Sequence, residues 1–290
     1  MRGTGPTLTR GWLRRIMHVP HKFCMFMPTY DEMLPAERLR FIQDRLTDRG
    51  RVLASELAKE LGISEDTIRR DLRDLAAQGV CQRVYGGAIV KSPASGAIRQ
   101  RQTQSADRKE QLGRTLATLV KRHQLVFIDA GTTNLAAARA LPHGMNWTVV
   151  THDPSVAAAL VGRDGIELQL IGGRVHPLTG AAMGGETMRA IRAMRPDVLM
   201  LGTCALDMQL GIGAFDAEDA DLKRALIEHA GSVALAVLNE KLGAAARYVV
   251  APASEIADVV VEADVPEPMV SALNQLNLRV HRAAAAQKPR

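Results

Sequence analysis

The segment Asp129-Ala-Gly-Thr-Thr133 has the residue types of a loop that binds an anion. It ends a short apolar run that begins at Leu125, and a helical pattern follows it as far as Leu141. Gly131 allows a ligand to approach the backbone closely, the threonines offer hydroxyl groups, and the free N–H groups at a helix start attract negative charge. The segment predicts a phosphate cradle, although the same residues also suit a plain turn followed by a helix cap.

Glycine and polar residues also follow other apolar runs in this half of the chain. These further groups are Thr151-His-Asp153, Gly172-Gly-Arg174, Gly202 and Asn239-Glu-Lys241. In a parallel sheet, ligands bind beyond the carboxyl ends of the strands, where such residues would gather. Each group alone has an ordinary explanation as a turn or a solvated side chain, but their shared position predicts one binding site.

The elements that must position these residues alternate between two patterns. Short β-type runs are separated by helical patterns, which is typical of an α/β domain with a largely parallel sheet. The β-type runs lie at residues 125–129, 147–151, 167–171, 197–202, 233–238, around 249 and at 259–262.

Two arginines on the outer face of a helix form a second chemical feature. Ile68, Leu72 and Leu75 recur with helical spacing and form a buried stripe. At about 100° per residue, Arg70 and Arg73 point away from that stripe. A helix that is apolar behind and cationic in front has the shape and charge to lie in the major groove of DNA.

Two further helices are predicted to hold this one. A support helix begins near Pro35, and a second helix begins with Ser55 as its N-cap. Gly62 can adopt the left-handed conformation that a tight helix exit requires, and Ser64 can cap the third helix. Together these signals predict a helix-turn-helix.

Short strands would add a wing to this unit. Val52 and residues 80–85 have strand composition, so that Arg83 and the Gly86-Gly87 tip would lie against the DNA backbone. The candidate DNA contacts are Ser64, Thr67, Arg69, Arg70, Arg73 and Arg83. Each arginine could bind either guanine or phosphate. The alternative is an amphipathic helix pair with a solvated arginine face, because this shape also occurs in proteins that do not bind DNA.

Residues 35–90 resemble the N-terminal domain of the DeoR family of bacterial transcriptional regulators. The family's S-x-D-T-I-R-R-D-L-x-x-L run stands at residues 64–75, and its R-x-H-G-G-A wing stands at residues 83–88, with Tyr85 in place of histidine. The resemblance implies a winged helix-turn-helix that binds operator DNA.

Residues 107–265 resemble the C-terminal sensor domain of the same family, which is similar in fold to ribose-5-phosphate isomerase and other sugar-phosphate isomerases. The resemblance implies a phosphorylated sugar or polyol as ligand. The residues it assigns to the effector are Asp129, Gly131, Thr132 and Thr133 of D-x-G-T-T, Thr151 of T-N, Gly172 and Gly173 of G-G, Asp207 and Gly211 of G-I-D-x-x-x-G, and Lys241 of D-x-S-K. Two positions depart from the pattern: His152 stands where the family has asparagine, and Asn239 stands where it has aspartate. Phe215-Asp216 resembles the glycerol-3-phosphate repressor branch.

The charge of the chain is uneven. Residues 1–124 carry 23 Lys and Arg against 13 Asp and Glu, whereas residues 125–290 carry 14 against 18. A polyanionic partner such as DNA therefore belongs to the N-terminal part. The 3 cysteines are too few and scattered for a disulfide framework or a four-cysteine zinc site, and the 8 histidines show no ligand spacing. We expect no metal, no cofactor and, since no apolar run reaches about 18 residues, no membrane span.

The chain length predicts two domains, and the residue patterns together with the resemblance imply this division: a disordered extension or over-extended start at 1–33, a winged helix-turn-helix domain at 34–91, a linker at 92–106, an α/β effector-sensing domain at 107–282 and a disordered tail at 283–290. The extension could instead be a basic arm or a targeting peptide, but it lacks a signal-peptide core and cleavage site.

These features predict a cytoplasmic, homo-oligomeric, DNA-binding regulator. We expect it to repress genes of carbohydrate or polyol metabolism and to leave its operator when a phosphorylated sugar or polyol binds. The alternative is a sugar-phosphate isomerase-like enzyme with a DNA-binding appendage. We expect no enzymatic activity, because the acidic loop of the isomerases is reduced here to Asp207 within residues 205–209.

Overall fold

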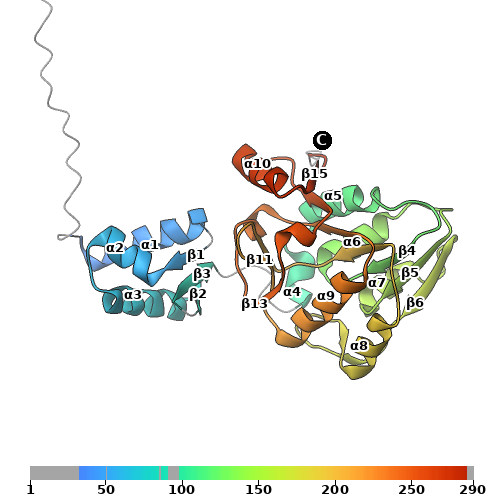
Figure 1. The fold of residues 1–290 in the computed structure, drawn as a ribbon, viewed down its shortest axis with the longest axis horizontal. Coiled ribbons are helices and arrows are strands. Elements are labelled where there is room, and N and C mark those ends of the chain that lie inside the picture. Colours follow the sequence, from blue (N-terminus) through green and yellow to red (C-terminus); the bar gives the residue numbers. More distant parts are fainter. Residues whose placement is uncertain (1–32, 50, 85, 91–97, 286–290) are drawn as a thin grey trace, which may run out of the picture.

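The computed structural model describes residues 33–49, 51–84, 86–90 and 98–285. It contains a small N-terminal domain and a larger C-terminal α/β domain (Figure 1). Residues 1–32 of the predicted extension, the wing residue Tyr85, and residues 286–290 of the predicted tail lie outside the described residues.

The N-terminal domain is a helix-turn-helix with an antiparallel three-stranded sheet of order β1-β3-β2. Its elements are α1 (Pro35–Arg49), β1 (Arg51–Leu53), α2 (Ala54–Leu61), α3 (Glu65–Ala77), β2 (Cys81–Val84) and β3 (Gly87–Val90). The predicted apolar stripe of α3 is buried and packs with Ile42 of α1 and Leu57 of α2. The winged helix-turn-helix prediction is therefore confirmed as a fold.

The predicted helix signals are confirmed at the turn between α2 and α3 but not at the start of α2. Gly62 is left-handed, with φ 65°, and Ser64 caps α3 by accepting a hydrogen bond from the Thr67 N–H. Ser55 is not an N-cap, because α2 begins one residue earlier at Ala54. The Ala54 N–H donates to the Gly86 carbonyl at 2.8 Å, so the sheet provides the partner that a cap would supply.

The C-terminal domain is built on seven parallel strands in the order β15-β14-β12-β9-β4-β5-β6, which confirms the predicted parallel sheet. The strands are β4 (Leu125–Ile128), β5 (Trp147–Thr151), β6 (Ile166–Leu170), β9 (Val198–Leu201), β12 (Val233–Ala236), β14 (Asp258–Val261) and β15 (Arg279–Arg282).

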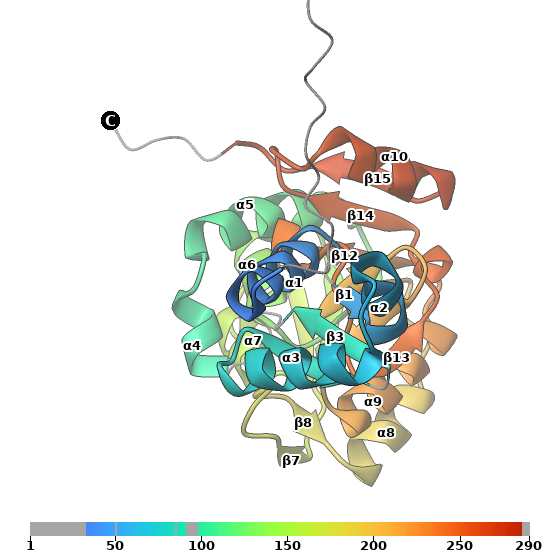
Figure 2. The same cartoon turned by 90° about the vertical axis from the view of Figure 1, so that its left-hand side faces the viewer.

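Helices cover both faces of this sheet (Figures 1 and 2). Val126 and Ile128 of β4 pack with one group of helices, and Phe127 between them packs with the other, as the two-residue period of a strand requires. The first group is α5 (Ala106–Ala117), α6 (Thr132–Ala140) and α7 (Pro154–Leu160), and the second is α8 (Gly185–Arg192), α9 (Ala217–His229) and α10 (Glu267–Gln275).

Shorter elements extend the domain beyond the carboxyl ends of the central strands. A hairpin pairs β7 (Arg174–Val175) with β8 (Ala182–Met183), and a small antiparallel sheet has the order β10-β11-β13. The remaining elements are β10 (Ala205–Asp207), β11 (Gly211–Ala214), β13 (Tyr248–Ala251) and the 3-10 turns η3 (Asn239–Lys241) and η4 (Ala253–Glu255).

Two predicted segments differ from the structure. The linker predicted at 92–106 contains a helix, α4 (Ile98–Thr103), whose six residues carry no buried apolar stripe that could have revealed it. Ala283, the first residue of the predicted disordered tail, is ordered, because it is buried and its N–H donates to the Val261 carbonyl at 2.8 Å. Within the described ranges, no helix is both long and apolar enough to cross a bilayer.

Candidate DNA-binding surface and ligand pocket

The outer face of α3 presents its arginines to solvent. Figure 2 shows α3 below α1 and α2, with β3 beside it. Arg70 and Arg73 are exposed, and no ion pair is recorded for either among the described residues. Arg69 is also exposed, but it is paired with Glu65 at 2.7 Å and Asp66 at 3.6 Å on its own helix. Arg70 and Arg73 are therefore the more available cations of the helix.

The other predicted DNA contacts lie near the two ends of this surface. Ser64 is exposed, and its hydroxyl lies 2.9 Å from that of the half-buried Thr67. Arg83 is exposed on β2, at the wing. The structure thus leaves all six predicted residues at least partly accessible, as DNA contact requires.

A buried ion pair fixes α3 against the support helix. The Arg38 guanidinium donates to both oxygens of Asp71, at 2.6 and 3.1 Å, and both side chains are largely buried. The sequence analysis did not predict this contact, because Asp71 resembles the other polar residues on the exposed side of the helix. It orients the face that carries Arg70.

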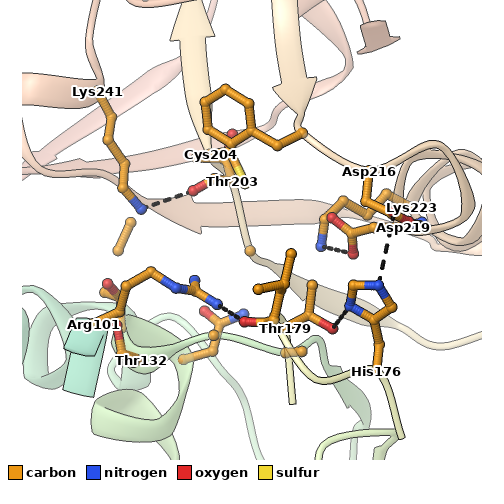
Figure 3. Close-up of a pocket in the computed structure, with 18 residues that line it drawn as sticks. Arg101, Thr132, His176, Thr179, Thr203, Cys204, Asp216, Asp219, Lys223 and Lys241 are labelled. Carbon is orange, nitrogen blue, oxygen red and sulfur yellow. Dashed lines mark hydrogen bonds and ion pairs between the residues drawn. The ribbon is translucent and has the colours of Figure 1, made fainter. Parts of the chain in front are cut away.

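A pocket of about 130 Å³ opens beyond the carboxyl ends of β4, β9 and β12 (Figure 3). Its walls come from α4, the start of α6, the β7–β8 hairpin, the start of α9 and η3. The lining residues are Arg101, Ala130, Gly131, Thr132, Thr133, Asn134, His176, Leu178, Thr179, Gly202, Thr203, Cys204, Phe215, Asp216, Asp219, Lys223, Ala236 and Lys241.

Four of the predicted effector residues line this pocket. Gly131 is the N-cap of α6, with φ 140°, and Thr132 and Thr133 open the helix, so its unpaired N–H groups face the cavity. Lys241 enters from η3, and its ammonium donates to the Thr203 carbonyl at 2.8 Å. Burial lowers the pKa of Lys241, and the Arg101 and Lys223 charges add to the shift.

Six other predicted residues do not line the pocket. Asp129 and Thr151 lie beneath it, fully buried. The Thr151 hydroxyl donates to the Ile128 carbonyl at 2.7 Å, which joins β5 to β4. The motif residues Gly172, Gly173, Asp207 and Gly211 shape loops outside the cavity.

Close contacts and hydrogen bonds explain the residue types at these four loop positions. A Cβ added at Gly173, with φ 148°, would lie 2.3 Å from the Thr187 hydroxyl, and one at Gly211, with φ 80°, would lie 2.2 Å from the Ala251 carbonyl. Asp207 accepts hydrogen bonds at 2.8 Å from the N–H groups of two following residues in the β10–β11 turn. The Gly172 carbonyl accepts from the Thr187 hydroxyl at 2.8 Å. These residues build the loops around the site.

Asp129 organises the floor of the pocket. Its carboxylate accepts hydrogen bonds at 2.8 Å from the N–H groups of Ala130 and Gly202, and it pairs with the Lys223 ammonium at 2.6 Å. Lys223 also lies 3.2 Å from Asp219, one turn earlier on α9. Asp129 thereby joins the loops after β4 and β9 to α9.

The charges of this cluster determine its pKa values. Burial raises the pKa of Asp129, but Lys223 and His152 outweigh burial and hold that pKa well below its ordinary range. Burial lowers the pKa of Lys223, but Asp129 and Asp219 outweigh it and raise that pKa above its ordinary value. Burial raises the pKa of Asp219 in spite of Lys223.

His152 completes this buried cluster and does not face the ligand. Its Nε2 lies 2.9 Å from an oxygen of Asp129, and its Nδ1 lies 2.9 Å from the Ala182 carbonyl. Both ring nitrogens therefore contact oxygen atoms of the protein and not the cavity. The side chains of Asp129, His152, Asp219 and Lys223 form one buried polar cluster.

Several lining residues were not predicted as site residues. Arg101 comes from the unpredicted helix α4, and His176 and Thr179 come from the β7–β8 hairpin. Asp219 and Lys223 carry the one signal that could have revealed them, an i,i+4 pair of opposite charge on a helix, but surface helices often show the same spacing.

Each of the two domains matches the model of a known protein family. Residues 38–94 match the model of the DeoR-like helix-turn-helix domain, and residues 104–263 match that of the DeoR C terminal sensor domain. The chain belongs to the DeoR family of transcriptional regulators.

The curated relatives of this DeoR-family protein are named as transcriptional regulators. The HTH-type transcriptional regulator GlpR of Haloferax volcanii is 34% identical over 216 residues, which cover 73% of this chain and 83% of the relative. The glycerol-3-phosphate regulon repressor of Escherichia coli is 29% identical, with coverage of 86% and 99%. The HTH-type transcriptional repressor GlcR of Bacillus subtilis is 30% identical, with coverage of 77% and 87%.

Solved structures similar to this DeoR-family protein include a regulator and an isomerase. The sorbitol operon regulator SorC of Klebsiella pneumoniae is 12% identical with a TM-score of 0.37, covering 83% of this chain and 99% of that one. Ribose 5-phosphate isomerase A of Neisseria gonorrhoeae is 10% identical with a TM-score of 0.33, covering 47% and 53%.

Proposed function

We propose that this DeoR-family regulator is a repressor of carbohydrate or polyol metabolism genes, released from its operator when a phosphorylated sugar or polyol binds the pocket. In this proposal, the DNA-binding domain spans residues 34–91 and the effector-sensing domain spans residues 107–282. It acts in the cytoplasm, where the operator is.

The proposed operator contact uses α3 in the major groove. Arg70 and Arg73 are exposed without ion pairs in the described part of the chain, which suits contact with base edges or phosphates. One such helix reads only a few base pairs. We therefore propose a homo-oligomer that presents paired α3 helices to repeated half-sites.

One observation carries the proposed effector: within the described residues, two basic side chains of the pocket donate their hydrogen bonds to backbone carbonyls. Lys241 donates to the Thr203 carbonyl at 2.8 Å, and Arg101 donates to the Leu178 carbonyl at 2.9 Å. Among the described residues, no carboxylate lies within ion-pair distance of either side chain. Together with the N-terminus of α6, they favour a ligand that carries a phosphate group.

The remaining lining residues suit the hydroxyl groups of a sugar or polyol. Thr132, Thr133 and Thr179 offer hydroxyls, and Asp216 offers a carboxylate oxygen. One relative named above is the glycerol-3-phosphate regulon repressor of Escherichia coli. By similarity to it, we propose a phosphorylated sugar or polyol as the ligand of this protein.

We further propose that the pocket binds without turnover. An isomerase requires a carboxylate that is free to accept a proton from the substrate carbon. Asp219 is paired with Lys223, and Asp216 caps α9 by accepting from the Asp219 N–H at 3.0 Å. Both lining carboxylates therefore have structural partners.

The test combines ligand binding with operator binding. Glycerol 3-phosphate, glucose 6-phosphate and fructose 1-phosphate are compared with glycerol, glucose and fructose in thermal denaturation of the full chain. At about 100 times its Kd, a ligand adds about 2.7 kcal/mol of stability. This should raise the Tm by about 5–10 °C.

A phosphorylated compound that stabilises the protein should also release a fluorescent DNA fragment from upstream of the gene. Lys241→Ala should bind the DNA normally but lose the response, whereas the exposed Lys121→Ala serves as control. The proposal fails if sugars act as well as their phosphates, or if Lys241→Ala responds fully. Steady conversion of any of these sugar phosphates would overturn the proposed absence of turnover.

A further inference from the structure

The helix α4 contributes a side chain to the pocket although it precedes the first strand of the sheet. In the sequence, only residues 91–97 separate α4 from β3, the last strand of the DNA-binding domain. Its residue Arg101 lines the cavity together with the start of α6. The part of the sensor domain nearest the DNA-binding domain in the sequence is therefore part of the pocket wall.

Arg101 has unused hydrogen-bonding capacity inside the pocket. Its Nη2 donates to the Leu178 carbonyl, but its Nε is buried and has no hydrogen-bond partner among the described residues. A guanidinium can donate through two parallel N–H groups to two oxygens of one phosphate. An anion in the pocket would provide a hydrogen-bond partner for this buried donor.

Positive charge is concentrated around this side chain. Figure 3 shows Arg101 and Lys241 reaching into the cavity from facing walls. Burial lowers the pKa of Arg101 in spite of Cys204, Asp219 and Asp153 nearby. The pKa of Lys109 is lowered to about 8, mainly by burial and to a smaller extent by the Lys241 and Arg101 charges. An anionic ligand would relieve this mutual repulsion.

The position of α4 depends on contacts with the walls of the pocket. Lys109 of α5 donates to the carbonyls of Arg101 and Gln104, the latter at 2.5 Å, and so holds the end of α4. Ile98 at its start packs against the β7–β8 hairpin, where a Cβ added at Gly180 would lie 3.4 Å from Ile98 Cγ1. Short, partly buried contacts therefore hold α4, and Arg101 with it, between α5 and the β7–β8 hairpin.

We infer that Arg101 binds the anionic group of the effector and that this contact couples the pocket to the DNA-binding domain. The inference rests on the proposed function, since it takes the effector to be a phosphorylated compound. In this inference α4 has two positions, and ligand binding favours the one in which the Arg101 Nε meets the phosphate. A ligand shifts such an equilibrium only by its different affinities for the two positions. Operator affinity changes when the two positions of α4 place α3 differently.

The experiment separates ligand affinity from coupling in the full-length protein. Arg101→Gln, Arg101→Lys and the control Arg99→Gln, an exposed arginine of the same helix, are compared with wild type. Inorganic phosphate, glycerol 3-phosphate and glucose 6-phosphate are the probes. Isothermal titration gives the Kd of each probe, and fluorescence anisotropy gives operator affinity without probe and at about 100 times each protein's own Kd.

Arg101→Gln should bind the best probe about 10- to 100-fold more weakly, as expected for the loss of charged hydrogen bonds. Even at saturation it should keep most of its operator affinity. Arg101→Lys should recover part of the binding, since it retains the charge but not the paired donors. Unchanged operator affinity without probe shows that the variants are folded, and Arg99→Gln should behave as wild type.

Three results would overturn the inference in distinguishable ways. If Arg101→Gln binds the probe and releases DNA like wild type, the inference is wrong while the proposed function stands. If it binds weakly but releases DNA fully at saturation, Arg101 binds the effector but does not couple it. If wild type binds none of the probes, the proposed function fails and the inference fails with it.

Discussion

Replacement of Lys223 by methionine should destabilise the C-terminal domain by about 3–5 kcal/mol, the range for removing one partner of a buried ion pair. The Lys223 ammonium lies 2.6 Å from Asp129 and 3.2 Å from Asp219, and all three side chains are at most 5% exposed. The variant leaves the buried carboxyl groups of Asp129 and Asp219 without their ammonium partner. Methionine has a similar length, so the effect comes from charge rather than from an empty volume.

The fluorescence of Trp147 provides a measurement specific to this domain. The indole is buried, and its N–H donates to the Lys121 carbonyl at 2.6 Å. The other tryptophan of the chain, Trp12, is removed by Trp12→Phe in every variant. Urea titration then gives the free energy of unfolding, and Tm should fall by about 6–20 °C, at about 2–4 °C per kcal/mol for a domain of this size.

The pH dependence tests the electrostatic origin of the loss. Burial raises carboxyl pKa values, and in the variant Lys223 no longer offsets this effect for Asp129 and Asp219. The folded variant then binds more protons than the unfolded chain above the ordinary carboxyl pKa, so its stability falls as pH rises. The loss in free energy of unfolding relative to wild type should therefore be smaller at pH 5 than at pH 8.

Two controls make the reasoning refutable. Arg192→Met removes an exposed cation from α8 and should change stability by less than about 0.5 kcal/mol. Addition of Asp219→Asn to Lys223→Met should restore part of the loss, because it removes one unpaired carboxylate. A loss below about 1 kcal/mol for Lys223→Met, or a deficit that does not vary with pH, would show that the cluster is not a buried ionic network.

Further predictions concern the DNA-binding domain and one loop. Arg70→Ala should weaken specific operator binding by about 10- to 100-fold and leave the Tm unchanged, because its side chain is exposed; a wild-type footprint would contradict this. Asp71→Asn should lower the stability of the N-terminal domain by about 1–3 kcal/mol in urea titration, since it leaves the Arg38 guanidinium without its buried partner; equal midpoints would exclude that role. Gly211→Ala should destabilise by at least about 2 kcal/mol, because the new Cβ meets the Ala251 carbonyl, whereas Gly62→Ala should lose only about 1 kcal/mol, since no atom lies within 4 Å. Similar losses for the two glycine variants would show that backbone conformation alone decides the outcome.

Local signals in the sequence were sufficient for the elements of the DNA-binding domain. Gly62 and Ser64 mark the turn, and the stripe of Ile68, Leu72 and Leu75 sets which face of α3 is exposed. The one misplaced cap, Ser55, fails for a non-local reason, since the Gly86 carbonyl from the wing provides the first partner of α2. A contact between residues far apart in the sequence replaced a local one.

The ligand pocket shows the opposite balance. Motif residues such as Gly131 and Thr132 line it, but others, including Asp129 and Gly211, support it from beneath or beside. The same motifs contain residues that line the pocket and residues that hold a loop, so spacing alone does not distinguish the two kinds. Arg101 carries no motif and still lies in the cavity.

By itself, the sequence determined the two domain types, the parallel sheet and the helix that carries the exposed arginines, because hydrophobic periodicity, caps and glycines act over a few residues. Only the tertiary structure decided which side chains meet at the pocket and that Asp129, His152, Asp219 and Lys223 form one buried cluster. The four residues come from three separate segments of the chain, so their contacts and their burial depend on how the whole chain packs.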